Sequence, residues 1–285
     1  MATACKPLSP ALSRPAPVFR VGAFIFLWKK PLAFFSLLCY ASRGLFCIFQ
    51  VISMHTSQIL RDNSTPASIA KNALLAAVSL FFNGFGLYLT IQANIGAGPW
   101  DVLNLGLSRT LGILYGNASI AVSLTILLVD VLMREPIGIA MFIDAVVVGK
   151  TVDLFNYFEL IPPCSSPFAG VLLMLAGRVV LAYSQYFYMR SALGCGPRDS
   201  LLMGLARRDG RVPIGVINTA IFSTVTFVGW LLGGPVGLGT LICAFCTGPI
   251  MQAVFRSVHF DATSIRHQHL AETLKILFAG RKRHA

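Results

Sequence analysis

Charged residues are scarce in this sequence, and the common signatures of soluble enzymes are absent from it. Only 12% of its 285 residues are charged, whereas 55% are hydrophobic, and the mean hydropathy is +0.72. A soluble core of this size could not bury so much apolar surface, so a soluble globular domain is excluded. The sequence contains no Walker A run, no G-x-S-x-G elbow and no H-E-x-x-H motif. We therefore predict that the protein is not an enzyme, does not hydrolyse ATP by itself and uses no cofactor.

Cysteine spacing of the kind that binds zinc is also missing. The sequence has one cysteine pair at i, i+3, Cys243 and Cys246, but no second C-x-x-C pair. That pair allows two interpretations, a metal or redox site or two small residues compatible with lipid, and we favour the second. The sequence therefore predicts no disulfide framework and no metal site.

Acidic residues are absent from residues 1–61, although basic residues are frequent there. This bias is typical of targeting segments. Lys29, Lys30 and Arg43 interrupt the apolar stretch of this region, so it could span the membrane, lie at its surface or be removed. Met54 could then be the true start. We treat residues 1–70 as an N-terminal extension that includes a candidate additional membrane segment.

Six apolar segments are each long enough to cross a bilayer, which takes about 20 helical residues. They predict an all-α polytopic membrane protein with six transmembrane helices. The segments are 72–94, 116–133, 137–158, 167–190, 213–232 and 236–255.

The sequence also repeats itself at an offset of 98 residues. The run GAGPWDVLNLGLSRTLG begins at Gly96, and the related run GCGPRDSLLMGLARRDG begins at Gly194. Further along, with one residue inserted, Pro136 matches Pro235. We assign membrane repeat one to residues 71–166, membrane repeat two to 167–256 and a basic tail to 257–285.

Each repeat contains three predicted crossings, and an odd unit repeated in tandem must insert its second copy upside down. Basic residues support this arrangement, because cytoplasmic loops concentrate Lys and Arg. If the chain before 72–94 lies inside, the outer connections hold only Arg109. We therefore predict two inverted three-helix repeats with a cytoplasmic C-terminus. The inner connections then hold Arg134, Arg190, Arg198, Arg207, Arg208 and Arg211.

The repeated motif resembles that of the YczE-like members of the YczE/YyaS/YitT group of uncharacterised bacterial integral membrane proteins. The resemblance covers about residues 72–256. It rests on GPWDVL after Ala97, on the second motif from Gly194, and on WLLGGPVGLGT from Trp230. Because members of this group carry no assigned activity, the resemblance implies a multi-pass protein of the bacterial cytoplasmic membrane and no particular chemistry.

The Gly-x-Gly-Pro-x-Asp motif predicts a helix start in each repeat. Glycine allows left-handed backbone, proline fits the first turn, and an aspartate two residues later is placed to cap the helix. Two helix starts that converge from opposite faces of an inverted repeat would bind an anion or a polar solute. The alternative is two elbows at the membrane surface, in which the aspartates only cap short helices. The residues concerned are Gly96, Gly98, Pro99, Asp101, Gly194, Gly196, Pro197 and Asp199.

Ionisable residues inside the predicted spans are the other candidates, because each is costly in hydrocarbon unless it is paired or faces water. Lys150 and Asp153 are i, i+3 neighbours and could neutralise each other. Asp144 has no obvious partner in its own segment, and Arg178 is a plausible partner from the next one. These residues serve either in structural ion pairs or in a substrate or proton path.

This architecture favours a transporter-like permease that moves a small solute or ion between the repeats, although a fold alone does not define an activity. The alternative is a regulatory or assembly factor that does not transport and holds a partner with its basic inner surface. The partners we expect are membrane lipid, a small solute or ion and a second copy of the chain. We do not expect nucleic acid, because the basic residues flank the apolar segments.

Overall fold

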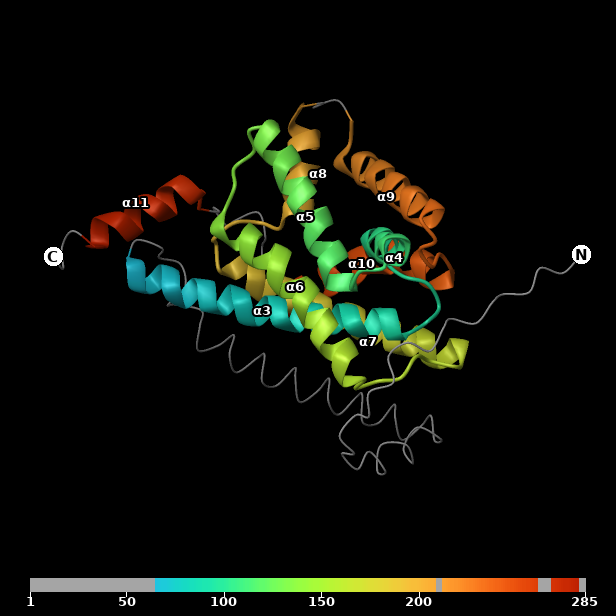
Figure 1. Ribbon diagram of the computed structural model, residues 1–285. Coiled ribbons are helices and arrows are strands. Elements are labelled where there is room, and N and C mark those ends of the chain that lie inside the picture. Colours follow the sequence, from blue (N-terminus) through green and yellow to red (C-terminus); the bar gives the residue numbers. More distant parts are fainter. Residues whose placement is uncertain (1–64, 209–211, 261–267, 282–285) are drawn as a thin grey trace, which may run out of the picture. The chain divides into compact units, whose positions relative to one another are not determined.

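A computed structural model describes residues 65–208, 212–260 and 268–281, and every regular element in these ranges is a helix (Figure 1). The prediction of an all-α protein is therefore confirmed. The predictions for residues 1–60, including a start at Met54, lie outside this part of the chain. The helices are α3 (Pro66–Gln92), α4 (Pro99–Leu111), α5 (Tyr115–Leu132), α6 (Ile139–Phe158), α7 (Pro167–Arg190), α8 (Pro197–Arg208), α9 (Ile214–Leu231), α10 (Leu238–Ser257) and α11 (Leu270–Arg281).

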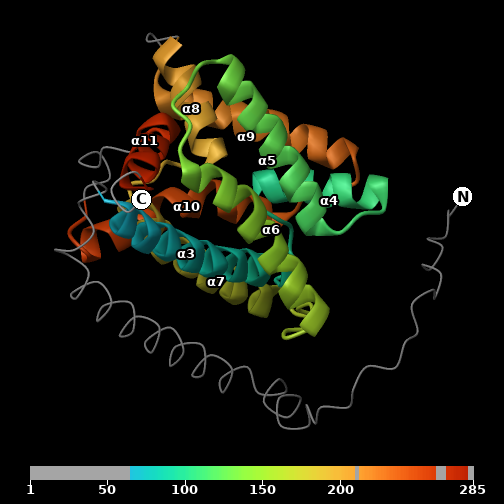
Figure 2. The same ribbon diagram turned by 60° about the vertical axis from the view of Figure 1, so that its left-hand side comes forward.

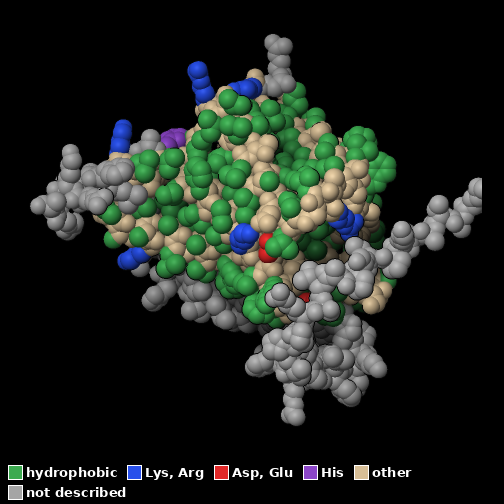
Figure 3. Space-filling view, viewed as in Figure 1, with side chains coloured by type: hydrophobic (Ala, Val, Ile, Leu, Met, Phe, Trp, Pro, Cys, Tyr) green, Lys and Arg blue, Asp and Glu red, His purple; other side chains and the backbone are tan. Residues whose placement is uncertain are grey.

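Helices α3, α5, α6, α7, α9 and α10 coincide with the six predicted membrane segments. Five of them are long and apolar enough to cross a membrane, and α6 is the exception because it carries Asp144, Lys150 and Asp153. Their outer surface is apolar: Leu132 is 73% exposed and Phe245 is 75% exposed. Figure 3 shows hydrophobic side chains over most of one face, with Lys and Arg as isolated spots. Such a surface fits a lipid environment.

The two sequence repeats fold into the same succession of elements, α3 to α6 and α7 to α10. The connection from the long helix to the short helix also has the same backbone in both repeats. Asn94 and Ala192 each have a φ of 54°, and Gly96 and Gly194 have φ of 111° and 130°. Only glycine adopts this last conformation without strain, which explains why both motifs begin with one.

Each of these connections is held by the last helix of the other repeat. The Gly239 N–H donates to the Ile95 carbonyl at 2.8 Å, and at the equivalent positions the Ala140 N–H donates to the Leu193 carbonyl at 3.3 Å. In the same crossed manner, α4 packs against α9 and α8 packs against α5. The repeats are therefore interlocked, and neither could form its motif connection alone.

The two long helices, α3 and α7, pack along each other and lie side by side in Figures 1 and 2. Glycines allow their close approach, because a Cβ atom at Gly177 would lie 2.8 Å from the Gly86 carbonyl oxygen. The Ser184 hydroxyl donates to the Ser79 carbonyl at 2.5 Å across the same interface. Small residues and serine hydroxyls are the usual means of packing helices in a bilayer.

The C-terminal tail contains a helix, α11, that the sequence did not predict. The chain that leads to it is bound to the repeats, since the Gln268 N–H donates to the Ala192 carbonyl at 2.8 Å and the Leu270 N–H donates to the Ile137 carbonyl at 2.7 Å. The start of this helix is therefore attached to both repeats.

Candidate functional site

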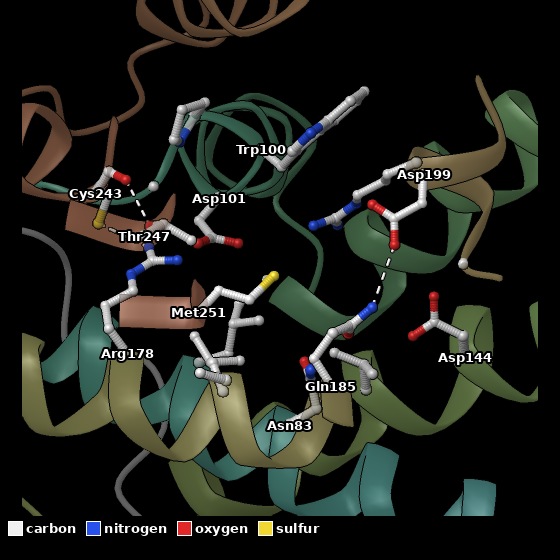
Figure 4. A pocket seen from close by; sticks show the side chains of 18 of the residues that line it. Asn83, Trp100, Asp101, Asp144, Arg178, Gln185, Asp199, Cys243, Thr247 and Met251 are labelled. Atoms are coloured by element: carbon white, nitrogen blue, oxygen red, sulfur yellow. Dashed lines mark hydrogen bonds between the residues drawn. The ribbon is translucent and has the colours of Figure 1, made fainter. Parts of the chain in front are cut away.

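A cavity of about 270 Å³ lies where the two motif copies meet, and all eight helices from α3 to α10 contribute to its wall (Figure 4). Its volume suits a small solute, because sites for drug-sized ligands are usually larger. The structure thus brings together helix starts that lie far apart in the sequence. The residues singled out from the sequence that line this cavity are Gly98, Pro99, Asp101, Asp144, Arg178, Gly196 and Asp199.

Asp101, in the first turn of α4, is buried against the cavity with 4% of its surface exposed. The predicted role of this side chain as a helix cap is wrong, because Gly98 is the capping residue and no side chain caps α4. Asp101 Oδ1 instead accepts a hydrogen bond from the Tyr115 hydroxyl at 3.0 Å. This bond ties α4 to α5 and leaves Oδ2 directed toward Gly98 and the cavity.

Arg178 reaches the same end of the cavity from the middle of α7. Its Nη2 donates to Cys243 Sγ at 2.7 Å, while its Nε has no hydrogen-bond partner. A Cβ atom at Gly98 would lie 2.6 Å from Arg178 Nη2 and 2.8 Å from Asp101 Oδ2, so glycine leaves room for both charged groups. Figure 4 shows Asp144 on the opposite side of the cavity, so the predicted Asp144–Arg178 pair is not formed.

The second motif presents a carboxylate at that opposite end. Asp199, in the first turn of α8, accepts a hydrogen bond from Gln185 Nε2 at 3.2 Å. A Cβ atom at Gly196 would lie 3.0 Å from Asp144 Oδ2 and 3.8 Å from Asp199 Oδ2. The two carboxylates therefore share one end of the cavity, where they favour a cationic group or a proton.

Trp100 and Arg198 lie between these ends and occupy the same position in the two motif copies. The Arg198 guanidinium carbon stacks 5.2 Å from the centre of the Trp100 ring. Both residues line the cavity. Sequence reasoning assigned Arg198 to an inner loop and gave Trp100 no role, although their shared motif position was a signal that they would lie together.

The serine hydroxyls of α5 complete the polar wall and were also missed. Ser119 and Ser123 are only 3% and 5% exposed, line the cavity and make no side-chain hydrogen bond within the part of the chain that the structure describes. They lie one helical turn apart, so both can face a ligand. Cys243 was read from the sequence as an ordinary small residue, yet it lies on the cavity at the repeat position equivalent to Asp144.

Other predicted residues shape the fold and do not line the cavity. A Cβ atom at Gly96 would lie 2.7 Å from the Gly237 nitrogen, and one at Gly194 would lie 2.8 Å from the Gly138 Cα. Pro197 is buried at the first position of α8. These three residues allow the interlocked connections to form.

Lys150 and Asp153 also lie outside the cavity, and the prediction that they neutralise each other is wrong. Lys150 Nζ donates to Asn117 Oδ1 at 2.7 Å, and Asp153 Oδ1 accepts from the Gly116 N–H at 2.8 Å. Both side chains therefore connect α6 to the start of α5.

The charges that line the cavity do not neutralise one another directly. In the described ranges, the ion pair within 4.0 Å is Arg207–Glu135, at 3.1 Å and away from the cavity. Three carboxylates and two guanidinium groups therefore face a common space without a direct salt bridge between them. The same ranges hold no cluster of three His, Cys, Asp or Glu side chains suited to a metal ion.

The fold and the cavity define a class of protein: a multi-pass helical membrane protein in which two copies of one sequence unit surround a cavity with charged and apolar lining. Residues 70–256 match the model of a family of unknown function, DUF6198. The chain belongs to this family. The matched range contains every residue that lines the cavity.

Curated relatives confirm the resemblance noted in the motif. The chain is 29% identical over 189 residues to the uncharacterized membrane protein YczE of Bacillus subtilis, which covers 64% of this chain and 86% of that protein. An uncharacterized protein of Haemophilus influenzae is 28% identical over 179 residues, covering 63% of this chain and 80% of its own length. The uncharacterized protein YyaS of Bacillus subtilis is 23% identical over 184 residues. This match covers 64% of the present chain and 90% of YyaS. No solved structure matches the chain.

Proposed function

We propose that the protein is a small permease of the bacterial cytoplasmic membrane, which binds a small polar solute or ion in the central cavity. One observation carries this proposal: both copies of the motif bring charged side chains to the same cavity from distant parts of the sequence. Surface elbows would leave both aspartates in water. Asp101 is instead almost completely buried, and Asp199, although exposed, lines the cavity. Discontinuous helices that meet inside the bundle are the usual substrate site of secondary transporters.

In this proposal the two repeats lie in opposite orientations in the membrane. Three crossings per repeat require the inversion, and the crossed packing of α4 on α9 and α8 on α5 supports it. The excess of arginine in alternate connections supports a cytoplasmic C-terminus. The path for the solute then runs along the interface between the repeats, where the cavity lies.

The charges around the cavity favour a dipolar solute. Arg178 lies at one end beside Asp101, Asp144 and Asp199 share the other end, and Arg198 lies between the ends. A solute with one anionic and one cationic group would neutralise both ends at once, which offsets the cost of the unpaired charges. The free hydroxyls of α5 add donors and acceptors along the wall. A small zwitterion is therefore the solute class that the site fits best.

The experiment is uptake into sealed proteoliposomes that contain the purified protein. The probes are radiolabelled small amino acids, with simple amines and simple carboxylates as the two halves of a zwitterion. Asp144→Asn and Arg178→Gln are expected to lower the uptake at least about tenfold, a loss of ~1.4 kcal/mol of transition-state stabilisation. The matched control is Asp130→Asn, because Asp130 is a fully buried carboxylate that does not line the cavity.

Two outcomes would overturn the proposal. One is uptake of none of these solute classes above that of empty liposomes. The other is uptake that Asp144→Asn and Arg178→Gln leave unchanged while both variants are recovered in normal amounts. Loss of uptake in Asp130→Asn as well would show that any buried carboxylate is needed for folding, so the amount of folded protein is measured for every variant by gel filtration.

The alternative of a regulatory or assembly factor gains no support from the basic surface. Arg207 forms its ion pair with Glu135, and Arg208 donates to the Met133 carbonyl at 3.0 Å. Both arginines thus fasten α8 to the connection between α5 and α6. Arg211, the third arginine of that surface, lies outside the described residues.

A further inference from the structure

A pair of facing glycines closes the gap between α5 and α6. A Cβ atom at Gly149 would lie 2.8 Å from the Gly116 carbonyl oxygen and 3.1 Å from its Cα, so the two backbones touch. The hydrogen bonds made by Asp153 and Lys150 latch the same interface. Helices α5 and α6 are therefore tightly closed on each other beside the cavity.

The second repeat contains the same glycine pair, but there it is apart. With the offset of the repeat in this region, Gly116 corresponds to Gly215 in α9 and Gly149 corresponds to Gly248 in α10. A Cβ atom at either Gly215 or Gly248 would meet nothing within 4 Å. Glycine has no local advantage inside a helix, where it costs about 1 kcal/mol relative to alanine. Two glycines in open space therefore have no packing role in the arrangement described here.

The helix packing shows the same asymmetry. α5 packs extensively along α6, whereas α9 makes no comparable contact with α10 in the described residues. Phe222 of α9 and Thr247 and Met251 of α10 line the cavity, and Figure 4 shows Thr247 and Met251 beside Arg178. The cavity is thus closed by α5 and α6 on one side and borders the separated helices α9 and α10 on the other.

We propose that this packing is one of two, and that in the other α9 closes on α10 through Gly215 and Gly248 while α5 and α6 separate at Gly116 and Gly149. The exchange is possible because both repeats carry the same contact surface, and only one of the two is used here. Packed helix interfaces switch between discrete arrangements and do not deform continuously. Two packings of one bundle supply such a switch.

The element that moves carries a built-in hinge. Pro249 lies inside α10, directly after Gly248. A proline within a helix removes one backbone hydrogen bond and allows the helix to bend at that point. The equivalent position in α6 is Lys150, so the hinge exists only in the repeat that is open here. Bending of α10 at Pro249 would bring Gly248 toward α9.

The hydrogen bonds that Asp153 and Lys150 make between α6 and α5 explain why the packing described here is favoured. Asp153 and Lys150 hold α6 on α5, but their equivalents in α10 are Gln252 and Pro249, which make no such bonds to α9 in the described residues. The closed state of α5 and α6 is therefore stabilised by two polar contacts that the alternative lacks. Removing them is expected to move the population toward the second packing.

The exchange has a consequence that rests on the proposed function. If the repeats are inverted in the membrane, closing α9 on α10 and opening α5 from α6 transfers the opening of the cavity from one membrane face to the other. The two packings would then be the two ends of a transport cycle. The exchange of helix packing itself requires no transport and can be measured without a solute.

The test is oxidative cross-linking of the pair Gly215→Cys and Gly248→Cys in membranes, in a background without the other cysteines. A disulfide needs Cα atoms about 4.4–6.8 Å apart, a distance typical of touching glycines but not of residues with open space around them. The pair is expected to cross-link with copper phenanthroline. Asp153→Asn together with Lys150→Gln is expected to raise the rate several-fold.

Two control pairs make the result decisive. Gly116→Cys with Gly149→Cys is the positive control, because a Cβ atom at Gly149 would lie 3.1 Å from the Gly116 Cα in the packing described here. Gly215→Cys with native Cys246 is the negative control, because two residues turn an α-helix by about 200° and Cys246 therefore faces away from Gly248. The comparison counts when the positive control reacts. The proposal is then overturned if the Gly215→Cys and Gly248→Cys pair does not cross-link, or if the negative control cross-links equally.

This outcome is separable from that of the permease proposal. Cross-linking without uptake of any solute would support two packings in a protein that does not transport. Uptake without cross-linking would support a permease that works by another movement.

Discussion

Arg198 stacks on Trp100, and the two residues occupy the same position in the two copies of the repeated motif. In the inverted arrangement proposed above, an axis relates the repeats, and a residue can contact its own repeat equivalent only near that axis. This contact would then lie at the axis, at the cavity between the starts of α4 and α8. At this motif position one copy carries an aromatic residue and the other a cation, and the two attract each other, whereas two arginines would repel.

A swap of these residues tests the relationship. Trp100→Arg and Arg198→Trp are each expected to lower the free energy of unfolding by about 0.5–2 kcal/mol, the usual value of a cation–π contact. The double variant exchanges the partners across the axis and should recover most of the loss. Thermal unfolding of the purified protein in detergent measures all four proteins as a double-mutant cycle. A double variant as unstable as the sum of both singles would show that the two positions are not equivalent.

Much of the fold was predictable because the helices follow from regular patterns in the sequence. The lengths of the apolar segments gave the helices, and the spacing of glycine and proline gave the short helices α4 and α8. The side-chain partners were not predictable, since Lys150 and Asp153 bind residues of α5 and Arg178 binds Cys243 of α10. These are contacts between different helices, which only the folded bundle brings together. Proximity along one helix suggested partners that the geometry does not use.

Only the part of the cavity that the two motif copies form was predictable from the sequence. Two helix starts in equivalent places indicated a meeting point, but the contribution of α5 was invisible, because serine in an apolar helix usually bonds to its own backbone. Ser119 and Ser123 do not do so. The alignment of Cys243 with Asp144 was present in the sequence, yet a cysteine in an apolar segment carries no signal of its own.

The orientation of the repeats can be read from one pair of equivalent positions. Thr110 near the end of α4 and Arg208 at the end of α8 are both exposed and correspond across the repeat. The variants Thr110→Cys and Arg208→Cys are made one at a time in a background without other cysteines. They are expected to react with a membrane-impermeant maleimide from opposite sides of the membrane. Intact cells should label the first and inside-out vesicles the second. Labelling of both from the same side would exclude inverted repeats.

The two halves of the glycine pattern predict opposite tolerance to a larger side chain. Gly149→Val inserts a side chain where Gly116 leaves no room, so the variant is expected to lose about 1–3 kcal/mol of stability or more. Gly248→Val meets open space and should melt at or slightly above the wild-type temperature, because it removes a helical glycine. Thermal unfolding in detergent compares the two. Equal destabilisation would mean that Gly248 is also packed in the resting protein.

Uptake adds a second readout for the same pair. Gly248→Val should fold normally yet be unable to close α9 on α10, so we expect it to abolish uptake of any solute that the wild type transports. The control is Gly215→Ala, which adds a single methyl group in open space and should retain part of the activity. A Gly248→Val variant with full uptake would leave the glycine without a role in the cycle.

The hydrogen bond between Tyr115 and Asp101 predicts the effect of a small deletion. Tyr115→Phe removes only the hydroxyl that donates to Asp101 Oδ1 and leaves a buried carboxylate oxygen without this partner. Such a loss costs about 1–3 kcal/mol. Asp101→Asn keeps an oxygen that can accept the same bond, so it should be milder in a thermal unfolding assay. Greater stability of Tyr115→Phe than of Asp101→Asn would show that the charge of Asp101, and not its hydrogen bond, matters for the fold.

Cys195, in the connection that leads to α8, gives a prediction about pH. Burial, and secondarily the carboxylate of Asp199, raises the pKa of the Cys195 thiol to about 11. Because the thiolate is the reactive form, a variant with Cys195 as its single cysteine should react with maleimide very slowly at neutral pH. The logarithm of the rate should rise by about one per pH unit through pH 10, as the thiolate fraction does below the pKa. Mass spectrometry measures the rate, and the same thiol unfolded in dodecyl sulfate is the control. A rate that levels off near pH 8 would mean that the connection is open to water and that the second motif does not start at a buried position.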